Sequence, residues 1–156
     1  NVRFLRHPHY KRTRYNGFSR RTTEKSEKMF EYNFSVRGYE LDSYGHVNHA
    51  VYLNYLEQAR WELFRNLGLL GCFHENDLLL VVIDVHMRYS REISLFDEVI
   101  VRTGITSEPP YLVFHHKMYL KGSNLKICSA TIKTLFTDKG KLVRDIPKSI
   151  TDKLIT

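Results

Sequence analysis

Hydrophobic and polar residues alternate along residues 30–37, the first part of the chain with a regular pattern. Aromatic or aliphatic side chains occupy every second position, and the positions between them hold Glu31, Asn33, Ser35 and Arg37. A period of two puts all the apolar side chains on one face of an extended strand. The pattern therefore predicts a β-strand with one face turned to the core.

The spacing of the apolar residues changes after residue 48. From about His49 to Leu67 they recur three and four positions apart, at Val51, Tyr55, Leu56, Ala59, Leu63 and Leu67. This spacing is typical of an amphipathic α-helix, and Gly68 directly after it suits a left-handed cap. At ~1.5 Å per residue such a helix is roughly 27 Å long, enough to lie along a whole sheet.

Four further stretches of the chain have the composition of β-strands. They span residues 78–89, 98–107, 111–120 and 125–137. The connections between the last three are short and contain Pro, Gly, Ser and Asn, which suit antiparallel hairpins. A strand, a long helix and four strands in this order predict an α+β fold, with an antiparallel sheet and the helix packed on one face.

The first of these four stretches, residues 78–89, alternates with a period of two. We expect its odd-numbered residues from Val81 to Tyr89 on one face of the sheet, and its even-numbered residues from Val82 to Arg88 on the other. Residues 78–83 form the longest apolar run of the chain. That run is too short to cross a bilayer and suits a buried strand.

Length and composition indicate one globular domain. The chain has 156 residues, of which 42% are hydrophobic, enough for a single domain with a sizeable core. Its two cysteines, Cys72 and Cys128, form neither a metal-binding spacing nor a disulfide framework. Their pattern favours a reducing compartment.

The positive charge of the chain is concentrated before Met29. Residues 1–28 hold nine Lys or Arg and two Glu, a net charge of +7 that equals the net charge of the whole chain. Residues 29–156 are therefore neutral on balance, so the high pI is no argument that the folded domain binds nucleic acid. We expect a basic non-domain extension, 1–28, and a single domain, 29–156.

Three interpretations of residues 1–28 stay open. The segment is rich in Arg, Ser and Thr, so it is a leader of transit-peptide character, a basic arm that touches anionic partners, or an extension upstream of a start at Met29. It has no apolar segment of the secretory type.

A dense set of polar residues precedes and opens the predicted helix. From Asp42 the sequence reads D-S-Y-G-H-V-N-H-A-V-Y-L-N-Y-L-E-Q-A-R. A carboxylate thus lies seven residues ahead of the helix start, where backbone N–H groups are unpaired and the helix dipole is positive. A carboxylate beside such donors can act as nucleophile or base on a carbonyl whose oxygen the donors hold.

This motif resembles the signature of hotdog-fold acyl thioesterases of the 4-hydroxybenzoyl-CoA thioesterase type, and it is similar to that of plant plastid acyl thioesterases. The resemblance extends more weakly over residues 30–150. It implies a hotdog fold, in which a five-stranded antiparallel sheet wraps a long central helix. It also implies a homodimer with a continuous sheet and active sites at the interface, with further assembly to a homotetramer.

The same resemblance implies the activity and its two central groups. The expected reaction is hydrolysis of an acyl-CoA or acyl-carrier-protein thioester to free acid and thiol. Asp42 stands at the family's catalytic carboxylate, as nucleophile or as the base that activates water, and the backbone N–H of His49 stands at the oxyanion donor. From the residues alone, a turn cap is the favoured interpretation of Asp42, and only the resemblance favours catalysis.

Four further residues are expected to bind substrate. Gly45 allows a tight turn that brings the backbone near the ligand, and Asn48 orients water or polarises the carbonyl, or else caps the helix. Glu57 holds Asn48 or the attacking water, or else makes an interface contact. Arg91 belongs to the basic rim expected for the phosphates of coenzyme A or for an acidic carrier protein.

Other chemistries find little support in the sequence. His46, His49 and Glu57 do not have the spacing of a standard metal-ligand set, and we expect neither metal nor other cofactor. The sequence lacks G-x-S-x-G, a P-loop and G-x-G-x-x-G. The alternatives are a non-catalytic acyl-thioester-binding module, a nucleic-acid-binding protein that uses its basic arm and, less favoured, a dehydratase.

We expect an enzyme of fatty acid metabolism in the cytoplasm, or in the plastid stroma if residues 1–28 are a transit peptide.

Overall fold

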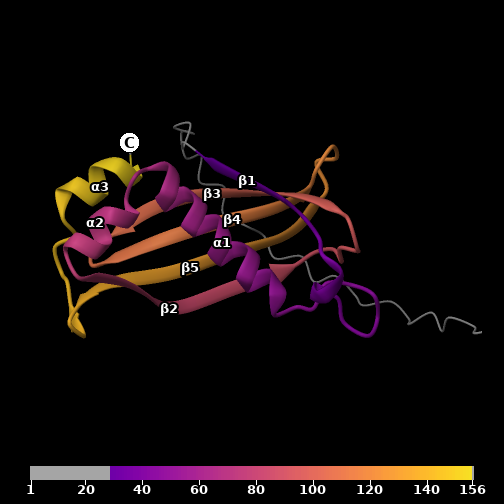
Figure 1. The fold of residues 1–156 in the computed structure, drawn as a ribbon, viewed down its shortest axis with the longest axis horizontal. Helices are drawn as coiled ribbons and strands as arrows, with labels where there is room; N and C mark the ends of the chain where they lie inside the picture. Colours follow the sequence, from indigo (N-terminus) through magenta and orange to yellow (C-terminus); the bar gives the residue numbers. More distant parts are fainter. Residues whose placement is uncertain (1–28, 156) are drawn as a thin grey trace, which may run out of the picture.

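A long helix lies across a curved antiparallel sheet (Figure 1). The structure, a computed structural model, describes residues 29–155. Helix α1 spans Val51–Asn66, and the sheet has the strand order β1-β3-β4-β5-β2, with the short β6 paired to β5. The strands are β1 (Phe30–Ser35), β2 (Leu78–Tyr89), β3 (Glu98–Glu108), β4 (Tyr111–Leu120), β5 (Lys126–Asp138) and β6 (Lys141–Leu142).

The core lies between α1 and the concave face of the sheet. Leu56, Ala59 and Leu63 on α1 are buried, and Phe114 and Ile132 oppose them from β4 and β5. The helical period of the first set and the period of two in the strands bring one face of each element together. Each fully buried Leu, Ile or Phe side chain contributes about 1.5–3 kcal/mol to this packing.

The predicted α+β hotdog architecture is confirmed. All strand pairs are antiparallel, and the five long strands end within two residues of the predicted bounds. Gly68 has φ of 63° and closes α1 as the predicted left-handed cap. The helix begins at Val51 rather than at His49, because His49 and Ala50 form a turn ahead of it.

Four short elements complete the fold of residues 29–155. They are the 3-10 turn η1 (Gly38–Glu40), the helices α2 (Leu70–Glu75) and α3 (Lys148–Ile155), and the strand β6. Figure 1 shows α2 and α3 together at one end of the molecule, with the loop that follows β1 at the other. None of the helices in residues 29–155 is long and apolar enough to cross a membrane.

Strand β2 differs from its prediction in two ways. It lies at the edge of the sheet with only β5 beside it, so the apolar residues at its centre are not buried: Val81, Val82, Ile83 and Val85 are between 41% and 45% exposed. A bulge at Ile83 also shifts the register.

The bulge explains why the predicted alternation of β2 is wrong below residue 84. Val85 lies opposite the core residue Ile132, and Val82 lies opposite the buried Thr134. Directly opposite residues share a face of a sheet, so the even-numbered Val82 points to the same side as the odd-numbered Val85. Because the bulge adds one residue to β2, even-numbered residues before it and odd-numbered residues after it point to the same face of the sheet.

A buried polar group interrupts the apolar core at its centre. His116 on β4 is 1% exposed; its Nδ1 lies 2.9 Å from the Thr103 hydroxyl, and its Nε2 has no hydrogen-bond partner. Burial, and next the charge of Arg60, lower the pKa of His116 to about 3, so the ring is neutral. The Arg60 guanidinium, 5.8 Å from the Phe114 ring centroid, is itself buried, which lowers its pKa.

Candidate active site

The loop between β1 and α1 folds into a tight turn around Asp42. The Asp42 N–H donates to the carbonyl of His46 (2.8 Å), and the Gly45 N–H donates to the carbonyl of Asp42 (3.1 Å). Gly45 has φ of 80°, a conformation that glycine adopts without strain. A Cβ at Gly45 would meet nothing within 4 Å, so the residue is needed for the turn and not for close packing within the chain.

Asp42 uses one carboxylate oxygen in this turn. Its Oδ1 accepts a hydrogen bond from the Tyr44 N–H at 2.8 Å, the turn-capping geometry that aspartate favours. The second oxygen, Oδ2, makes no hydrogen bond or ion pair with residues 29–155. The half-buried Asp42 side chain can therefore cap the turn through one oxygen and keep the other oxygen for a reaction.

The turn that opens α1 leaves one backbone donor unused. Asn48 Oδ1 accepts from the Ala50 N–H at 3.0 Å, and the Asn48 carbonyl accepts from the Val51 N–H at 2.9 Å. Within the described part of the chain, the His49 N–H has no acceptor. Asn48 thus stabilises the turn ahead of α1, whose N-cap residue is Ala50 without a side-chain cap hydrogen bond, and the His49 N–H remains available.

Tyr89, which the sequence analysis did not select, holds this turn against the sheet. Its hydroxyl donates to the His49 carbonyl at 3.0 Å, and its ring meets the Tyr52 ring edge-on. Burial raises the pKa of Tyr89. In the sequence, only its position at the end of a predicted strand could have indicated this role for Tyr89, because an alternating pattern does not show where a hydroxyl points.

A second loop lies beside the Asp42 loop and carries Arg91. The Val47 N–H donates to the Ile93 carbonyl at 3.0 Å, and His46 Nε2 lies 3.8 Å from Glu92 Oε1. Arg91 is exposed on this second loop, directly after β2. The structure therefore brings Arg91 to the same end of the molecule as Asp42.

Glu57 is not joined to this constellation. It is exposed on α1, and the Asn48 side chain bonds to Ala50 rather than to Glu57. A catalytic or substrate-binding role for Glu57 stays a prediction.

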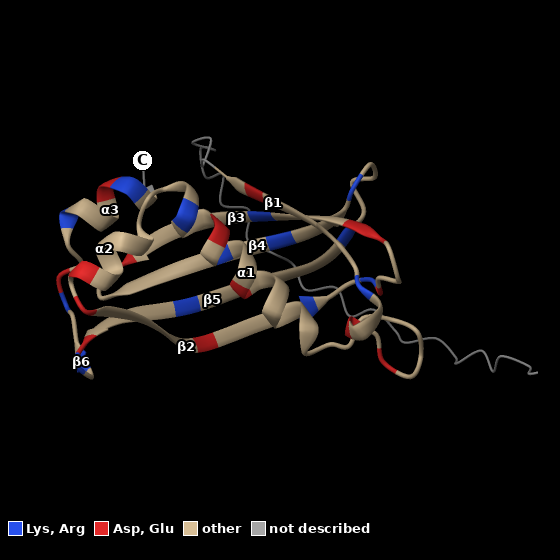
Figure 2. Ribbon diagram, in the orientation of Figure 1, with Lys and Arg blue, Asp and Glu red and all other residues tan. Residues whose placement is uncertain are grey.

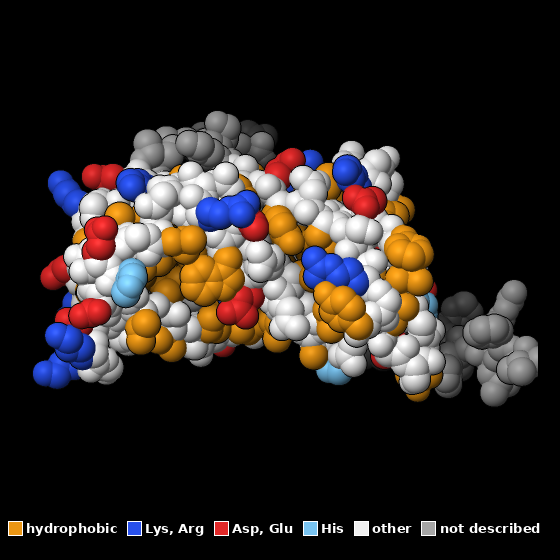
Figure 3. Space-filling view, viewed as in Figure 1, with side chains coloured by type: hydrophobic (Ala, Val, Ile, Leu, Met, Phe, Trp, Pro, Cys, Tyr) orange, Lys and Arg blue, Asp and Glu red, His pale blue; other side chains and the backbone are white. Residues whose placement is uncertain are grey.

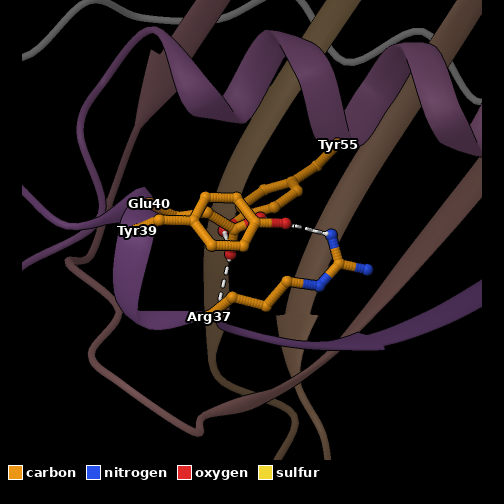
Figure 4. Close-up of polar contacts among 4 residues, drawn as sticks. All are labelled: Arg37, Tyr39, Glu40 and Tyr55. Atoms are coloured by element: carbon orange, nitrogen blue, oxygen red, sulfur yellow. Dashed lines mark hydrogen bonds and ion pairs between the residues drawn. The ribbon is translucent and has the colours of Figure 1, made fainter.

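A buried acid fixes the Asp42 loop to the helix (Figure 4). Glu40 is 6% exposed, and its Oε2 accepts from the Tyr55 hydroxyl and from the Arg37 N–H, each at 2.7 Å. The Glu40 carbonyl accepts from the Asn48 N–H at 3.0 Å. Burial, and next the hydrogen bond to Glu40, raise the pKa of Tyr55. One residue thereby holds both ends of the Asp42 loop.

Sequence reasoning missed Glu40 and the role of Tyr55, although both lie in the region of the motif. Tyr55 was assigned to the apolar stripe, where its ring does pack, and the pattern gives no sign of its hydroxyl. Residues 29–155 contain no group of three His, Cys, Asp or Glu side chains placed to hold a metal ion.

Comparison with known proteins assigns the family. A family model described as the Thioesterase-like superfamily matches residues 36–154. The solved structure of the probable thioesterase YbaW from Escherichia coli superposes with a TM-score of 0.73 at 23% identity, over 81% of this chain and 98% of that one. A hypothetical protein from Aquifex aeolicus gives a TM-score of 0.74 at 25% identity, over 80% and 98%. The chain therefore belongs to the Thioesterase-like superfamily.

Two relatives carry named activities. The long-chain acyl-CoA thioesterase FadM of Escherichia coli is 40% identical over 62 residues, a match that covers 40% of this chain and 47% of FadM. The chloroplastic acyl-acyl carrier protein thioesterase ATL3 of Arabidopsis thaliana is 29% identical over 132 residues, 82% of this chain and 68% of ATL3. The match thus spans less than half of FadM, and about two thirds of ATL3. At the level of the family, the predicted thioester hydrolase is confirmed.

Proposed function

We propose that the protein hydrolyses the thioester of a fatty acyl-CoA or acyl carrier protein, releasing the free acid and the thiol. The observation that carries this proposal is the pairing of an unengaged carboxylate oxygen, Asp42 Oδ2, with an unengaged donor, the His49 N–H, on one hydrogen-bonded loop. Membership of the Thioesterase-like superfamily and the names of FadM and ATL3 support the substrate class.

In this mechanism the thioester carbonyl lies between the two groups. The His49 N–H holds the carbonyl oxygen as negative charge develops on it, a contribution typically worth roughly 3 kcal/mol. Asp42 either attacks the carbonyl carbon, giving an anhydride that water then hydrolyses, or takes a proton from the attacking water. In both routes the C–S bond breaks, and the thiolate leaves and is protonated.

Recognition of the carrier is proposed to involve Arg91. Both CoA phosphates and the acidic surface of a carrier protein attract a cation at the mouth of the site, and Arg91 lies exposed beside the Asp42 loop. Elsewhere, charges of both signs are spread over helices, strands and loops (Figure 2). A local cation, rather than a strongly basic domain, is therefore the basis for this part of the proposal.

We further propose that two copies pair along β2 and continue the sheet, with a homotetramer as the further assembly. β2 is a long edge strand with exposed apolar residues on both of its faces. An unprotected edge of this kind offers a row of unpaired N–H and C=O groups to a second strand. Pairing there would bring a second subunit beside the end of β2, where Tyr89 holds the His49 turn.

For localisation we propose the cytoplasm, or the plastid stroma if residues 1–28 are a transit peptide. Two free cysteines, Cys72 and Cys128, suit a reducing compartment. Cell fractionation of the tagged full chain tests this; recovery from an oxidising compartment would contradict it.

The central experiment compares Asp42→Asn with the unchanged protein on a panel of acyl-CoA and acyl-carrier-protein thioesters, following thiol release. Asn keeps an Oδ1 that accepts from the Tyr44 N–H, so the turn is preserved while the reactive oxygen is lost. We expect kcat to fall by about 10²–10⁴-fold. Asp145→Asn, at an exposed loop position, is the matched control.

Hydrolysis that survives Asp42→Asn would contradict the mechanism. Tight acyl-CoA binding without turnover by the unchanged protein would favour the non-catalytic binding module instead.

A further inference from the structure

A cavity of about 410 Å³ opens between β1 and α1. Its lining residues come from β1, the η1 turn and the first two turns of α1, and they are Tyr32, Phe34, Arg37, Tyr39, Glu40, Val51, Asn54, Tyr55 and Gln58. Neither Asp42 nor His49 is among them. Figure 3 shows basic and hydrophobic side chains next to each other on the face that carries α1. The volume lies in the range of small-molecule sites in proteins, about 300–1,000 Å³.

One oxygen of the buried Glu40 carboxylate has no hydrogen-bond donor. Oε2 is engaged by the Tyr55 hydroxyl and the Arg37 N–H. Oε1 has only the Arg37 guanidinium, with Nη1 at 3.6 Å, which is longer than a hydrogen bond. The Glu40 side chain is more than nine-tenths buried, and a donor that reaches Oε1 from the cavity adds a charge-assisted hydrogen bond.

Free donors lie beside this free acceptor. Arg37 Nη1 donates to the Tyr39 hydroxyl at 2.8 Å, and the guanidinium makes no other hydrogen bond within residues 29–155. Its Nε–H and Nη2–H groups therefore remain available. Because the negative charge of Glu40 and the positive charge of Arg37 nearly compensate each other, the cavity favours neither an anion nor a cation.

A neutral group that donates and accepts on the same side fits the Glu40–Arg37 pair. A lactam is such a group, because its ring holds the amide N–H and C=O side by side. Aromatic rings of Tyr32, Phe34 and Tyr55 form an apolar wall next to it: the Phe34 and Tyr55 centroids are 4.1 Å apart and those of Tyr32 and Phe34 5.7 Å. Asn54 and Gln58 add amide groups from α1.

We propose that this cavity binds a small, neutral, amphipathic molecule that carries a lactam, a secondary amide closed in a ring. Its N–H donates to Glu40 Oε1, its carbonyl accepts from the Arg37 guanidinium, and its aryl or alkyl body packs on Tyr32, Phe34 and Tyr55. The site is separate from Asp42, so its occupancy does not depend on thioester hydrolysis.

The test uses two probes that differ in one donor, 4-phenyl-2-pyrrolidinone and 1-methyl-4-phenyl-2-pyrrolidinone, titrated into the isotope-labelled full chain and followed by backbone amide NMR shifts. We expect 4-phenyl-2-pyrrolidinone to shift the resonances of Arg37, Tyr39 and Asn54. The methylated probe, which has no N–H, should bind about ten-fold more weakly, the usual scale for losing a hydrogen bond to a charged group.

Two variants place the binding in the cavity. Asn54→Trp adds a large ring at an exposed position of the lining and should abolish the shifts, whereas Asn33→Trp, on the opposite face of β1 from Phe34, should leave them unchanged.

Glu40→Gln keeps an oxygen for Tyr55 but replaces the free acceptor with a donor, so it should remove the preference between the probes.

Equal affinity of the two probes for the unchanged protein would overturn the proposal. So would shifts that map to β2 instead of the cavity, or binding that Asn54→Trp leaves intact.

Discussion

At the scale of single residues, the site combines structural and chemical roles in the same side chains. Asp42 caps its own turn through Oδ1 and keeps Oδ2 unengaged, and the Asn48 side chain stabilises the turn that precedes α1. The sequence offered capping and catalysis as competing interpretations of Asp42. The geometry accommodates both, because a carboxylate has two oxygens and a turn needs only one.

Tyr89→Phe is expected to lower kcat by about five- to ten-fold, the scale of one net hydrogen bond. The hydroxyl donates to the carbonyl of His49, so its removal loosens the backbone of the residue whose N–H we propose as the oxyanion donor. Steady-state kinetics on one acyl-CoA provide the measurement. Tyr119→Phe is the control, since its ring contact with Arg102 needs no hydroxyl. Equal losses in both variants would contradict the role of Tyr89.

His116→Leu is expected to flatten the loss of stability in acid. In the unfolded chain the pKa of His116 is 6.5, whereas in the folded chain burial lowers it to about 3. Between these values the unfolded state binds the extra proton, so the free energy of unfolding falls as the pH falls from 6.5 toward 3. One residue contributes at most about 1.4 kcal/mol per pH unit.

Urea unfolding at pH 7, 6, 5 and 4 measures this slope for the unchanged protein and for His116→Leu. His74→Gln, at an exposed position on α2, controls for the loss of any histidine. Parallel pH profiles for the unchanged protein and His116→Leu would show that His116 is not the source.

At the scale of elements, hydrophobic periodicity located the long helix and the long strands, but it did not locate the bulge in β2 or the contacts of Glu40. α1 and the five long strands follow from their periods of 3.6 and two. The bulge at Ile83 was invisible, because β2 is apolar at consecutive positions there and an extra residue leaves no trace in such a run. Glu40 was missed for another reason: its partners, Arg37 and Tyr55, are brought together only by the fold.

The double substitution Val81→Lys with Val85→Lys is expected to convert the proposed dimer to a monomer and to abolish thioester hydrolysis with it. It places a charge on each face of the exposed β2 edge, where two copies would otherwise bury apolar side chains. Sedimentation velocity and thiol release are the measurements.

Leu142→Lys serves as the control for this pair, since Leu142 is an exposed apolar residue on another short strand, β6. An unchanged sedimentation coefficient for the double variant, or an active monomer of the unchanged protein, would contradict pairing along β2.

At the scale of the whole molecule, the basic segment precedes the part of the chain that matches the family. The net charge of +7 lies in residues 1–28, and the family match begins at residue 36. Composition separates these parts in charge, but it gives no physical basis for choosing among a leader, a basic arm and an upstream extension, because all three have the same composition.

A chain that starts at Met29 is expected to fold and to hydrolyse acyl-CoA with kcat within about two-fold of the full chain, as a domain with its own core does. If residues 1–28 attract an anionic carrier, only KM should change, and the difference should shrink as salt is added. Kinetics at two ionic strengths measure both quantities. A large fall in kcat would show that the first 28 residues belong to the catalytic domain.

The bulge at Ile83 has a consequence for what the open side of β2 accepts. A straight, flat segment from an unfolded chain would meet a local kink and a change of twist there, and it would lose hydrogen bonds on one side of the kink. A copy of β2 that runs the other way brings the same kink with it, related by a two-fold axis. In the proposed dimer, the bulge therefore favours pairing of β2 with a second copy of itself over pairing with an unrelated straight strand. It thereby protects the exposed apolar edge against aggregation.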